Sequence, residues 1–459
     1  MSPHGVPGPT RVSRSFCSDV IMVTPLPAFD VSYPKTQSVL SGPMATLRSR
    51  CRCTSILARG GVIHGRIFLL GTEISLCRKT QIPGRSDTMT PDENRRFTQV
   101  GPGTPAGNLM RRYWWPVWFS DSVATKPVPV RVLGEGLILF RDGSGALGLI
   151  ERACPHRGAG LELGRVESDG IRCCYHGWKF DRTGACLDMP AEPDDTPLKR
   201  EVRARTYPAR EVAGLVFAYM GPEPAPEFPA YDLLFRDGLT RVIGAFEEHC
   251  NWMQRAENAV DQMHSIALHA SVYPDVALQR PDVEWERTWY GVRAAFRVPN
   301  GFAKVSHFLF PANSRYFGAR VGDNPSHILR FRVPVDDEKT MTFFIRGREA
   351  RGTPETITNE GLKSRVRGVY DRMEDEWWGL HSRDQDRAAQ ESQGVIAPRT
   401  GETLATSDTG VAIFRKMLDD AIRTVERGED PPGVMRGPQG NDLITFDAQK
   451  MRAGAVIEA

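Results

Sequence analysis

The sequence lacks several features that would assign it to common protein classes. No apolar run approaches the about 20 residues that a membrane-spanning helix needs, so we expect no membrane segment. From Met89 onward, 48 Lys and Arg stand against 52 Asp and Glu, and this balance excludes the basic footprint of a nucleic-acid-binding protein. No G-x-G-x-x-G segment occurs in a βαβ pattern, so the chain is not expected to bind a dinucleotide itself.

Secretory features are lacking as well. The nine cysteines are odd in number and no signal peptide is recognisable, so we expect no disulfide framework. We therefore expect the protein to reside in a reducing compartment, and we predict a cytoplasmic location. The chain is long: its 459 residues exceed one typical domain and predict two domains with substantial cores.

Residues 1–88 differ from the rest of the chain in charge. They contain eleven Lys and Arg against four Asp and Glu, together with many Pro, Ser and Gly. An acid-poor leader rich in Arg and Ser is typical of an organelle transit peptide. The alternative is upstream sequence translated from a start placed too early, with Met89 as the genuine initiator. We favour the second interpretation and expect residues 1–88 to be mostly disordered.

A small all-β domain is expected over residues 89–222, preceded by a short helix. Residues 128–150 contain three β-rich runs separated by glycine turns, which predicts a meander. A further hairpin is expected around residues 182–184, and the prolines at 222–229 predict a linker.

Two short segments of this domain combine cysteine with histidine. Cys154 and His156 form C-x-H, and Cys173 and His176 form C-x-x-H. Two thiolates and two imidazoles from separate loops suit a [2Fe-2S] cluster, in which the cysteines bind one iron and the histidines the other. The alternative is a Cys2His2 zinc site. The glycines beside both segments favour the cluster, because tight turns let backbone amides point at its sulfurs.

The complete segment, CPHRGAGLELGRVESDGIRCCYHGWKF, resembles the Rieske [2Fe-2S] domain in spacing and flanking residues. The resemblance implies that Cys154 and Cys173 bind the inner iron and that His156 and His176 bind the outer, redox-active iron. Cys174 stands where many members of the family have proline, and we interpret it as a non-ligand.

Residues 223–459 predict a second, α+β domain. Strand-like runs occur at 241–246, 283–298, 302–310, 328–334 and 340–346, and helical composition at 251–270, 355–393 and 407–427. This arrangement predicts a helix-grip-like domain, in which long C-terminal helices cover an antiparallel sheet.

The helical run at 251–270 contains Asp261, His264 and His269. Two histidines near an aspartate suggest mononuclear iron, but residues five apart lie about 140° around a regular helix and cannot converge on one ion. We therefore predict a π-bulge or a break between His264 and His269. Alone, this pattern is a weak indicator, since helix histidines are more often partly buried residues without a metal.

The run is also similar to the N-x-x-D-x-x-H-x-x-x-x-H segment of Rieske non-haem iron oxygenases. The resemblance implies that both histidines bind Fe(II) and that a later carboxylate is the third ligand. Asp386, within DQDRAAQES, matches best, with Asp384 and Glu391 as rivals. It further implies that Asp261 is catalytic by connecting the iron to His176 of a neighbouring subunit, in a head-to-tail homotrimer or homohexamer.

Within that family, most of residues 89–420 is similar to the homomeric branch of phthalate dioxygenase oxygenase subunits and aromatic O-demethylases. This implies a mono- or dioxygenase that uses O2 and electrons from NAD(P)H, delivered by a separate flavin and iron-sulfur reductase, to hydroxylate or O-demethylate an aromatic substrate. A substrate carboxylate would require an arginine. The candidates are Arg287, Arg293, Arg297, Arg315 and Arg320. A Rieske-type electron-transfer protein without oxygenation chemistry is the alternative, and it would need only the first domain.

Overall fold

The computed structural model describes residues 89–301, 303–321, 324–363, 380–437 and 442–446. All of them belong to one compact unit, Cys77–Ala459. The predictions made for residues 1–88 lie outside the described residues. None of the described helices combines the length and apolar character that crossing a bilayer requires.

Two short capped helices open the described chain. Helix α1 (Pro91–Thr98) follows Thr90, whose side chain accepts the N–H of Glu93 while the Glu93 carboxylate accepts the N–H of Thr90. This capping box satisfies backbone donors that a helix start leaves without partners. Helix α2 (Pro105–Met110) likewise follows a threonine and begins with proline, which is favoured at the first helical position.

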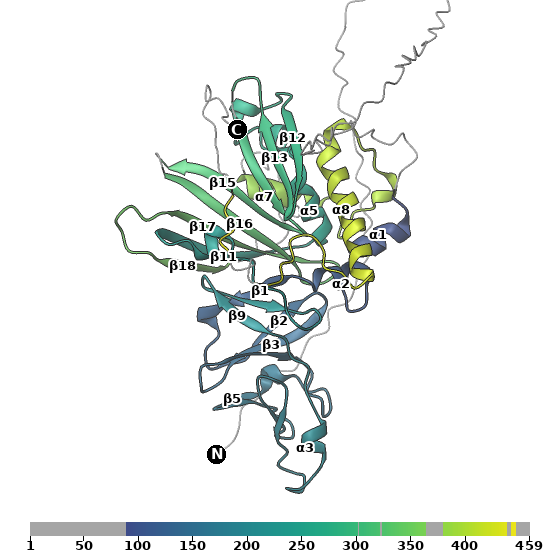
Figure 1. The fold of residues 1–459 in the computed structure, drawn as a ribbon, viewed down its shortest axis with the longest axis vertical. Helices are drawn as coiled ribbons and strands as arrows, with labels where there is room; N and C mark the ends of the chain where they lie inside the picture. Colours follow the sequence, from purple (N-terminus) through teal and green to yellow (C-terminus); the bar gives the residue numbers. More distant parts are fainter. Residues whose placement is uncertain (1–88, 302, 322–323, 364–379, 438–441, 447–459) are drawn as a thin grey trace, which may run out of the picture. The chain divides into compact units, whose positions relative to one another are not determined.

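Three small sheets form the predicted first domain (Figure 1). Their orders are β1-β10-β9, β2-β3-β4 and β5-β6-β7-β8. The strands are β1 (Trp114–Phe119), β2 (Val128–Val132), β3 (Glu135–Arg141), β4 (Leu147–Glu151), β5 (Arg165–Glu167), β6 (Gly170–Arg172), β7 (Lys179–Phe180), β8 (Cys186–Asp188), β9 (Ala209–Val212) and β10 (Leu215–Tyr219), with helix α3 (Leu198–Glu201) after β8. The predicted meander is β2–β4, and the predicted hairpin joins β7 to β8.

One eight-stranded sheet dominates the second half, in the order β12-β13-β14-β15-β16-β17-β11-β18. Its strands are β11 (Leu239–Glu248), β12 (Asp282–Thr288), β13 (Gly291–Arg297), β14 (Ala303–Leu309), β15 (Asn313–Val321), β16 (Asn324–Pro334), β17 (Thr340–Glu349) and β18 (Ile357–Leu362). The pairing is antiparallel except at the edge, where β18 lies parallel to β11.

The sequence predictions need three corrections in this sheet. Residues 283–298 form a hairpin rather than one run, because the chain turns between β12 and β13. Strand β15 was not predicted. The segment 355–393, predicted to be helical, begins with β18, because pairing with β11 overrides its weak local preference.

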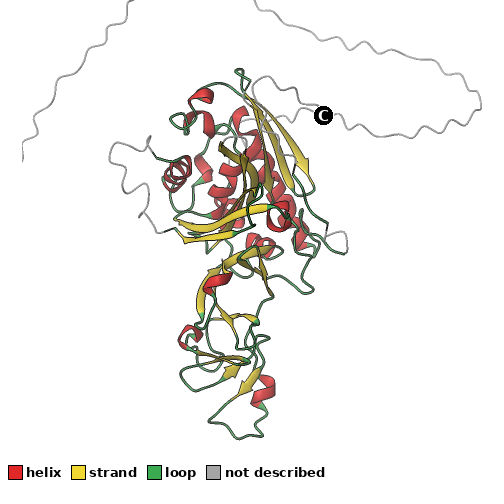
Figure 2. Ribbon diagram, turned by 90° about the vertical axis from the view of Figure 1, so that its left-hand side faces the viewer, coloured by secondary structure: helices red, strands yellow, loops and turns green. Residues whose placement is uncertain are grey.

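The helices are α4 (Asp232–Phe235), α5 (Trp252–Val260), α6 (His264–Ala267), α7 (Ser382–Glu391) and α8 (Thr409–Glu426). Figure 2 shows helices gathered against one side of the curved sheet. Helix α5 contacts strands β15 and β16 of the sheet and also helices α7 and α8. The predicted helix at 407–427 is confirmed as α8, and α7 confirms the last part of the predicted helix at 355–393. Residues 364–379 of that predicted helix lie outside the described residues.

The hydrophobic core is divided unevenly. The β5–β8 sheet shares a small core with strands β3 and β4, in which Ile171 and Phe180 pack with Ile138 and Ile150. The larger core contains residues from both halves of the chain, for example Leu137 and Phe217 from the first and Phe331 from the second. Phe217 and Phe331 meet edge to face, with ring centroids 5.4 Å apart. The sheets β1-β10-β9 and β2-β3-β4 therefore pack as part of the larger core.

Candidate metal centres

The two Cys/His loops have the same backbone geometry. The first joins β4 to β5 and the second joins β6 to β7. In each loop the cysteine carbonyl accepts the N–H of the glycine four residues later, Gly158 at 2.8 Å and Gly177 at 3.2 Å. Both glycines have φ of 76°, in the left-handed region that strains other residues. The glycines on which the sequence prediction relied thus form two equivalent turns.

These turns bring the four predicted ligands together. Cys154 and Cys173 are each 3% exposed, and the rings of His156 and His176 lie 4.5 Å apart between centroids. His156 stacks on Trp178 at 4.3 Å, with the ring planes 7° apart. Cys174 is exposed, unlike Cys173, as a non-ligand would be.

The surroundings of the buried thiols suit iron-bound sulfur. Burial, together with the neighbouring Cys173, raises the pKa of Cys154 to about 11. The backbone N–H groups of His156 and Arg157 oppose this by donating to the sulfur. Amides that stabilise a thiolate, together with a Cys2His2 donor set split into two pairs, fit a [2Fe-2S] cluster.

The helical run that contains Asp261, His264 and His269 is interrupted. The main interruption lies before His264, upstream of the break predicted between the two histidines. Helix α5 ends at Val260, and Asp261 is extended with ψ of 115°. The Asp261 carboxylate accepts the N–H of Met263 at 2.7 Å, a local turn that competes with the helix. Helix α6 then begins at His264 and ends at Ala267, before His269. The predicted break between His264 and His269 is present, because α6 ends at Ala267. The additional interruption at Asp261, before His264, was not predicted.

His264, His269 and Asp386 converge. One possible ligand atom from each lies within 4.8 Å of the others, which makes them the single such group of three or more residues in the described part of the chain. The Nε2 atoms of His264 and His269 lie 3.5 and 3.2 Å from Asp386 Oδ1. His269 is 5% and Asp386 7% exposed. Two imidazoles and one carboxylate are the donor set of the facial triad that binds mononuclear iron.

The charge state of Asp386 suits a cation. Burial by itself raises the pKa of Asp386, but the interactions with His269 and His264 more than offset it, so the pKa lies well below its usual range. The Asn258 amide also donates to Asp386 Oδ1 at 3.2 Å. The rival carboxylates lie elsewhere, since Asp384 pairs with Arg387 and Glu391 accepts the N–H of His249.

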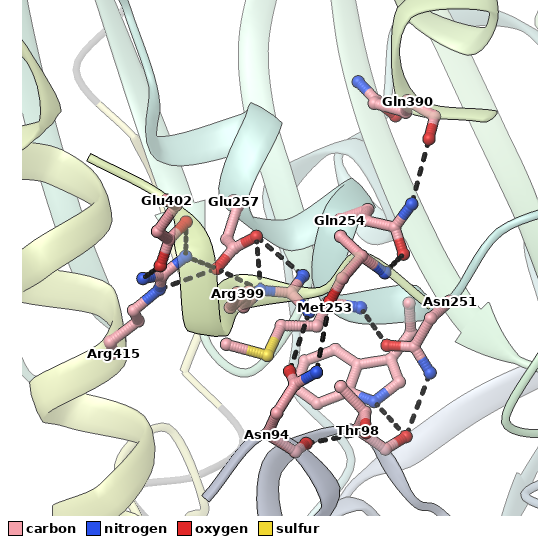
Figure 3. Close-up of polar contacts among 12 residues, drawn as sticks. Asn94, Thr98, Asn251, Met253, Gln254, Glu257, Gln390, Arg399, Glu402 and Arg415 are labelled. Atoms are coloured by element: carbon pink, nitrogen blue, oxygen red, sulfur yellow. Dashed lines mark hydrogen bonds and ion pairs between the residues drawn. The ribbon is translucent and has the colours of Figure 1, made fainter. Parts of the chain in front are cut away.

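Helix α5, which leads to this site, is held by buried polar contacts (Figure 3). The Glu257 carboxylate lies between Arg399 at 2.7 Å and Arg415 at 2.6 Å. Burial raises the pKa of Glu257, but the two arginines lower it by more than burial raises it. The net pKa is therefore lowered and the carboxylate is ionised. The Gln254 amide donates to the backbone carbonyl of Gln390, at the end of α7, at 2.9 Å. These contacts fix α5 relative to the helix that carries Asp386.

Four of the five predicted sheet arginines already have acidic partners. Arg287, Arg293 and Arg297 pair with Asp420, Glu286 and Glu284, and Arg315 forms a buried pair with Asp232. The side chain of Arg320 lies outside the described residues.

Sequence reasoning missed two other arginines, Arg330 and Arg332 on β16. Among the described residues no carboxylate pairs with either of them. Arg330 lies over the Tyr316 ring, 5.1 Å from its centroid. Burial raises the pKa of Tyr316, and Asp386 is among the charges close enough to affect it. The signal available in the sequence was the alternation of β16, which places both arginines on the face that bears Ser314 and Tyr316.

Comparison with known proteins agrees with this geometry. Residues 113–208 match the family model of the Rieske [2Fe-2S] domain. The 5,5'-dehydrodivanillate O-demethylase oxygenase subunit of Sphingobium sp. (strain NBRC 103272 / SYK-6) is 34% identical over 377 residues, which cover 78% of this chain and 86% of that protein. The chain belongs to the Rieske-type oxygenases, as an oxygenase subunit.

Other members of the family match over similar lengths. The phthalate 4,5-dioxygenase oxygenase subunit of Pseudomonas putida is 31% identical over 416 residues, covering 78% of this chain and 92% of that protein. The solved structure of Pseudomonas putida CBB5 NdmA with caffeine has a TM-score of 0.58 and 21% identity, covering 73% of this chain and 94% of that chain. At that identity the structural likeness shows the fold.

These matches confirm the predicted fold class, family and enzyme class. This oxygenase subunit is one component of a multicomponent enzyme system. It requires a separate electron-transfer partner and acts on a substrate with O2. Its family combines the Rieske cluster with a mononuclear iron. The electron-carrier alternative fits less well, because the matches extend through the second half of the chain.

Proposed function

We propose that this oxygenase subunit oxidises a carboxylated aromatic compound at a mononuclear iron held by His264, His269 and Asp386. The convergence of these three side chains is the observation that carries the proposal. Cys154, His156, Cys173 and His176 would hold the [2Fe-2S] cluster. When bound, the cluster supplies single electrons and the mononuclear iron activates O2. The donor is proposed to be an NAD(P)H-dependent reductase, and the location the cytoplasm.

Asp261 is proposed to connect the two centres. Its Oδ2 lies 3.5 Å from His264 Nδ1, and its side chain is 24% exposed. Burial raises the pKa of Asp261, but the interaction with His264 more than offsets it, so Asp261 is ionised and its charge favours a proton on His264 Nδ1. The exposed part of the carboxylate would face His176 of a neighbouring copy in a head-to-tail trimer or a stacked pair of trimers.

A carboxylated substrate is supported by relatives and by the sheet face. Relatives at 34% identity include a 3-chlorobenzoate-3,4-dioxygenase oxygenase subunit and a phenoxybenzoate dioxygenase subunit, whose names contain aromatic carboxylates. In this chain Arg330 has no acidic partner among the described residues. Its guanidinium lies 5.1 Å from the centroid of the Tyr316 ring, and the pKa of Tyr316 is raised by burial and also by the nearby charge of Asp386. An unpaired guanidinium near the metal triad can bind a carboxylate through two parallel hydrogen bonds.

Paired acids and esters would test the substrate class. Phthalate, 3-methoxybenzoate and 3-chlorobenzoate would be compared with their methyl esters, with NADH consumption and product formation measured together. Arg330→Gln should raise KM for an accepted acid about 10- to 100-fold, since charged hydrogen bonds contribute roughly 1.5–3 kcal/mol. The ester should be little affected. Arg297→Gln, which removes a partner of Glu284, is the control. Equal effects on acid and ester would contradict the assigned role of Arg330.

A further inference from the structure

The two histidines of the metal triad have different partners at their second ring nitrogens. His264 Nδ1 faces the carboxylate of Asp261 at 3.5 Å. His269 Nδ1 instead lies 2.9 Å from the side-chain oxygen of Gln385, a neutral amide. Gln385 directly precedes Asp386 on α7 and is fully buried. One helix turn therefore provides both a triad carboxylate and the group behind a triad histidine.

The Gln385 amide has a second contact at its other end. Its NH2 group donates to Ser271 Oγ at 3.0 Å. The amide oxygen faces His269 Nδ1 and can only accept a hydrogen bond there. His269 must then carry its proton on Nδ1, which leaves the lone pair of Nε2 facing Asp386 Oδ1, 3.2 Å away. Ser271 lies two residues after His269, so the contact also ties the chain that follows α6 to helix α7.

There is a physical reason why the partner of His269 at position 385 is a neutral amide rather than a carboxylate. A carboxylate at residue 385 would place a second negative charge beside Asp386 in a fully buried environment, where an uncompensated charge is strongly unfavourable. The amide fixes the ring without that cost. It also makes His269 a weaker base than an imidazole backed by a carboxylate, because such partners raise ligand basicity. His264, with Asp261 behind it, is the contrasting case.

We propose that Gln385 is a positioning residue that fixes the tautomer and ring orientation of His269 for metal binding. Its neutrality makes the two histidine ligands unequal in basicity. This inference rests on the proposed role of His269 as a metal ligand. Gln385 itself touches neither metal nor substrate, so its effect must appear in the binding and the spectrum of the metal.

The test uses the full chain, with its cluster intact and its mononuclear site emptied and titrated with Fe(II) or Co(II). Gln385→Leu removes the acceptor and should weaken metal binding about 10- to 100-fold, the usual effect of losing such a partner. Gln385→Glu keeps an acceptor and should retain metal binding, since the charge of the bound metal compensates the added carboxylate. It should shift the Co(II) absorption bands, because a charged acceptor strengthens the imidazole donor. A purely structural role would leave those bands unchanged.

Two controls keep the outcomes distinct. Gln393→Leu makes the same chemical change at an exposed residue just beyond α7 and should leave binding and spectrum unchanged. Ser271→Ala removes the Ser271 contact of the Gln385 amide and should weaken binding by a smaller factor, which provides a second variant if Gln385→Leu folds poorly. Wild-type affinity and bands in Gln385→Leu and Ser271→Ala would overturn the proposal. Unchanged binding in His269→Ala would instead overturn the metal-site assignment beneath it.

Discussion

The two proposed metal centres of this chain are constructed in contrasting ways. The cluster ligands come from two loops close together in sequence, each shaped by hydrogen bonds between residues four and five positions apart. The triad requires His264 and His269 to meet Asp386 from a distant helix, and it depends on buried contacts between α5 and α7. Local backbone geometry is sufficient for the first centre, whereas only tertiary packing creates the second.

The two proposed metal centres also differ in how far their surroundings are exposed to solvent. Pro155, Arg157 and Tyr175, beside the cluster histidines, are exposed, while His269, Gln385 and Asp386 are buried. An exposed rim allows an electron donor or a neighbouring subunit to approach the cluster. A buried triad limits the access of water, which strengthens the electrostatic interactions inside the site. The contrast therefore matches the separate tasks of receiving electrons and oxidising substrate.

The largest expected effect is loss of the whole cluster from one substitution. Cys173→Ser removes a thiolate that no other residue can replace, so the reduced Rieske EPR signal, the acid-labile sulfide and turnover should all disappear. The triad should still bind Fe(II), because no cluster residue contributes to it. Cys174→Ser, at the exposed neighbour, should keep the signal. The opposite result for the two cysteines would reverse the ligand assignment.

Asp386→Ala should give the complementary result. The mononuclear iron and turnover should be lost while the Rieske signal remains, because the triad loses its only carboxylate. Asp384→Ala is the matched control, since Asp384 pairs with arginine and lies outside the triad. Measured iron per chain together with EPR separates the two sites. Retained mononuclear iron in Asp386→Ala would favour one of the rival carboxylates.

Asp261→Asn should leave both centres occupied and nevertheless almost abolish turnover. The substitution removes the charge that holds the His264 Nδ1 proton, and with it the proposed link to the next subunit. Rapid mixing of the reduced protein with substrate and O2 would follow reoxidation of the cluster, which should slow sharply. Asp282→Asn, at an exposed position on β12, is the control. Normal reoxidation in Asp261→Asn would refute the link.

The smallest predicted effect concerns the free energy of unfolding. It compares a buried ion pair in the second half of the chain with an exposed ion pair in the first half. Arg255 and Glu248 pair at 2.8 Å with both side chains fully buried. Arg255→Met leaves a buried carboxylate without its partner and should cost about 3–5 kcal/mol. Arg165→Met breaks a pair in which Arg165 is 75% exposed and should cost at most about 1 kcal/mol. Urea unfolding followed by tryptophan fluorescence would measure both.

A double substitution sharpens that comparison. Glu248→Leu combined with Arg255→Met removes both charges and should recover much of the lost stability, because the penalty arises from the carboxylate left alone. Failure to recover would show that Arg255 acts mainly through its other contact, with Gln390 on α7.

Much of the fold could be predicted from local pattern. The meander β2–β4, strands β11, β14, β16 and β17, and helix α8 follow from alternation, turn residues and helical composition. Strand β18 and the interruption at Asp261 could not be predicted in this way. β18 exists because it pairs with β11, and α5 ends where the Asp261 side chain forms its own turn.

By itself, the sequence determined the cluster loops, because their ligands and turn glycines lie within a few residues of one another and need no distant partner. It also indicated His264, His269 and Asp386 as a set through resemblance to a family. Only the tertiary structure decided that these three meet and that Gln385 lies behind His269. It also decided that Arg330, unlike four of the five predicted arginines, has no acidic partner among the described residues. Those relations join residues far apart in the chain, and the packing of helices on a sheet, rather than spacing along the sequence, creates them.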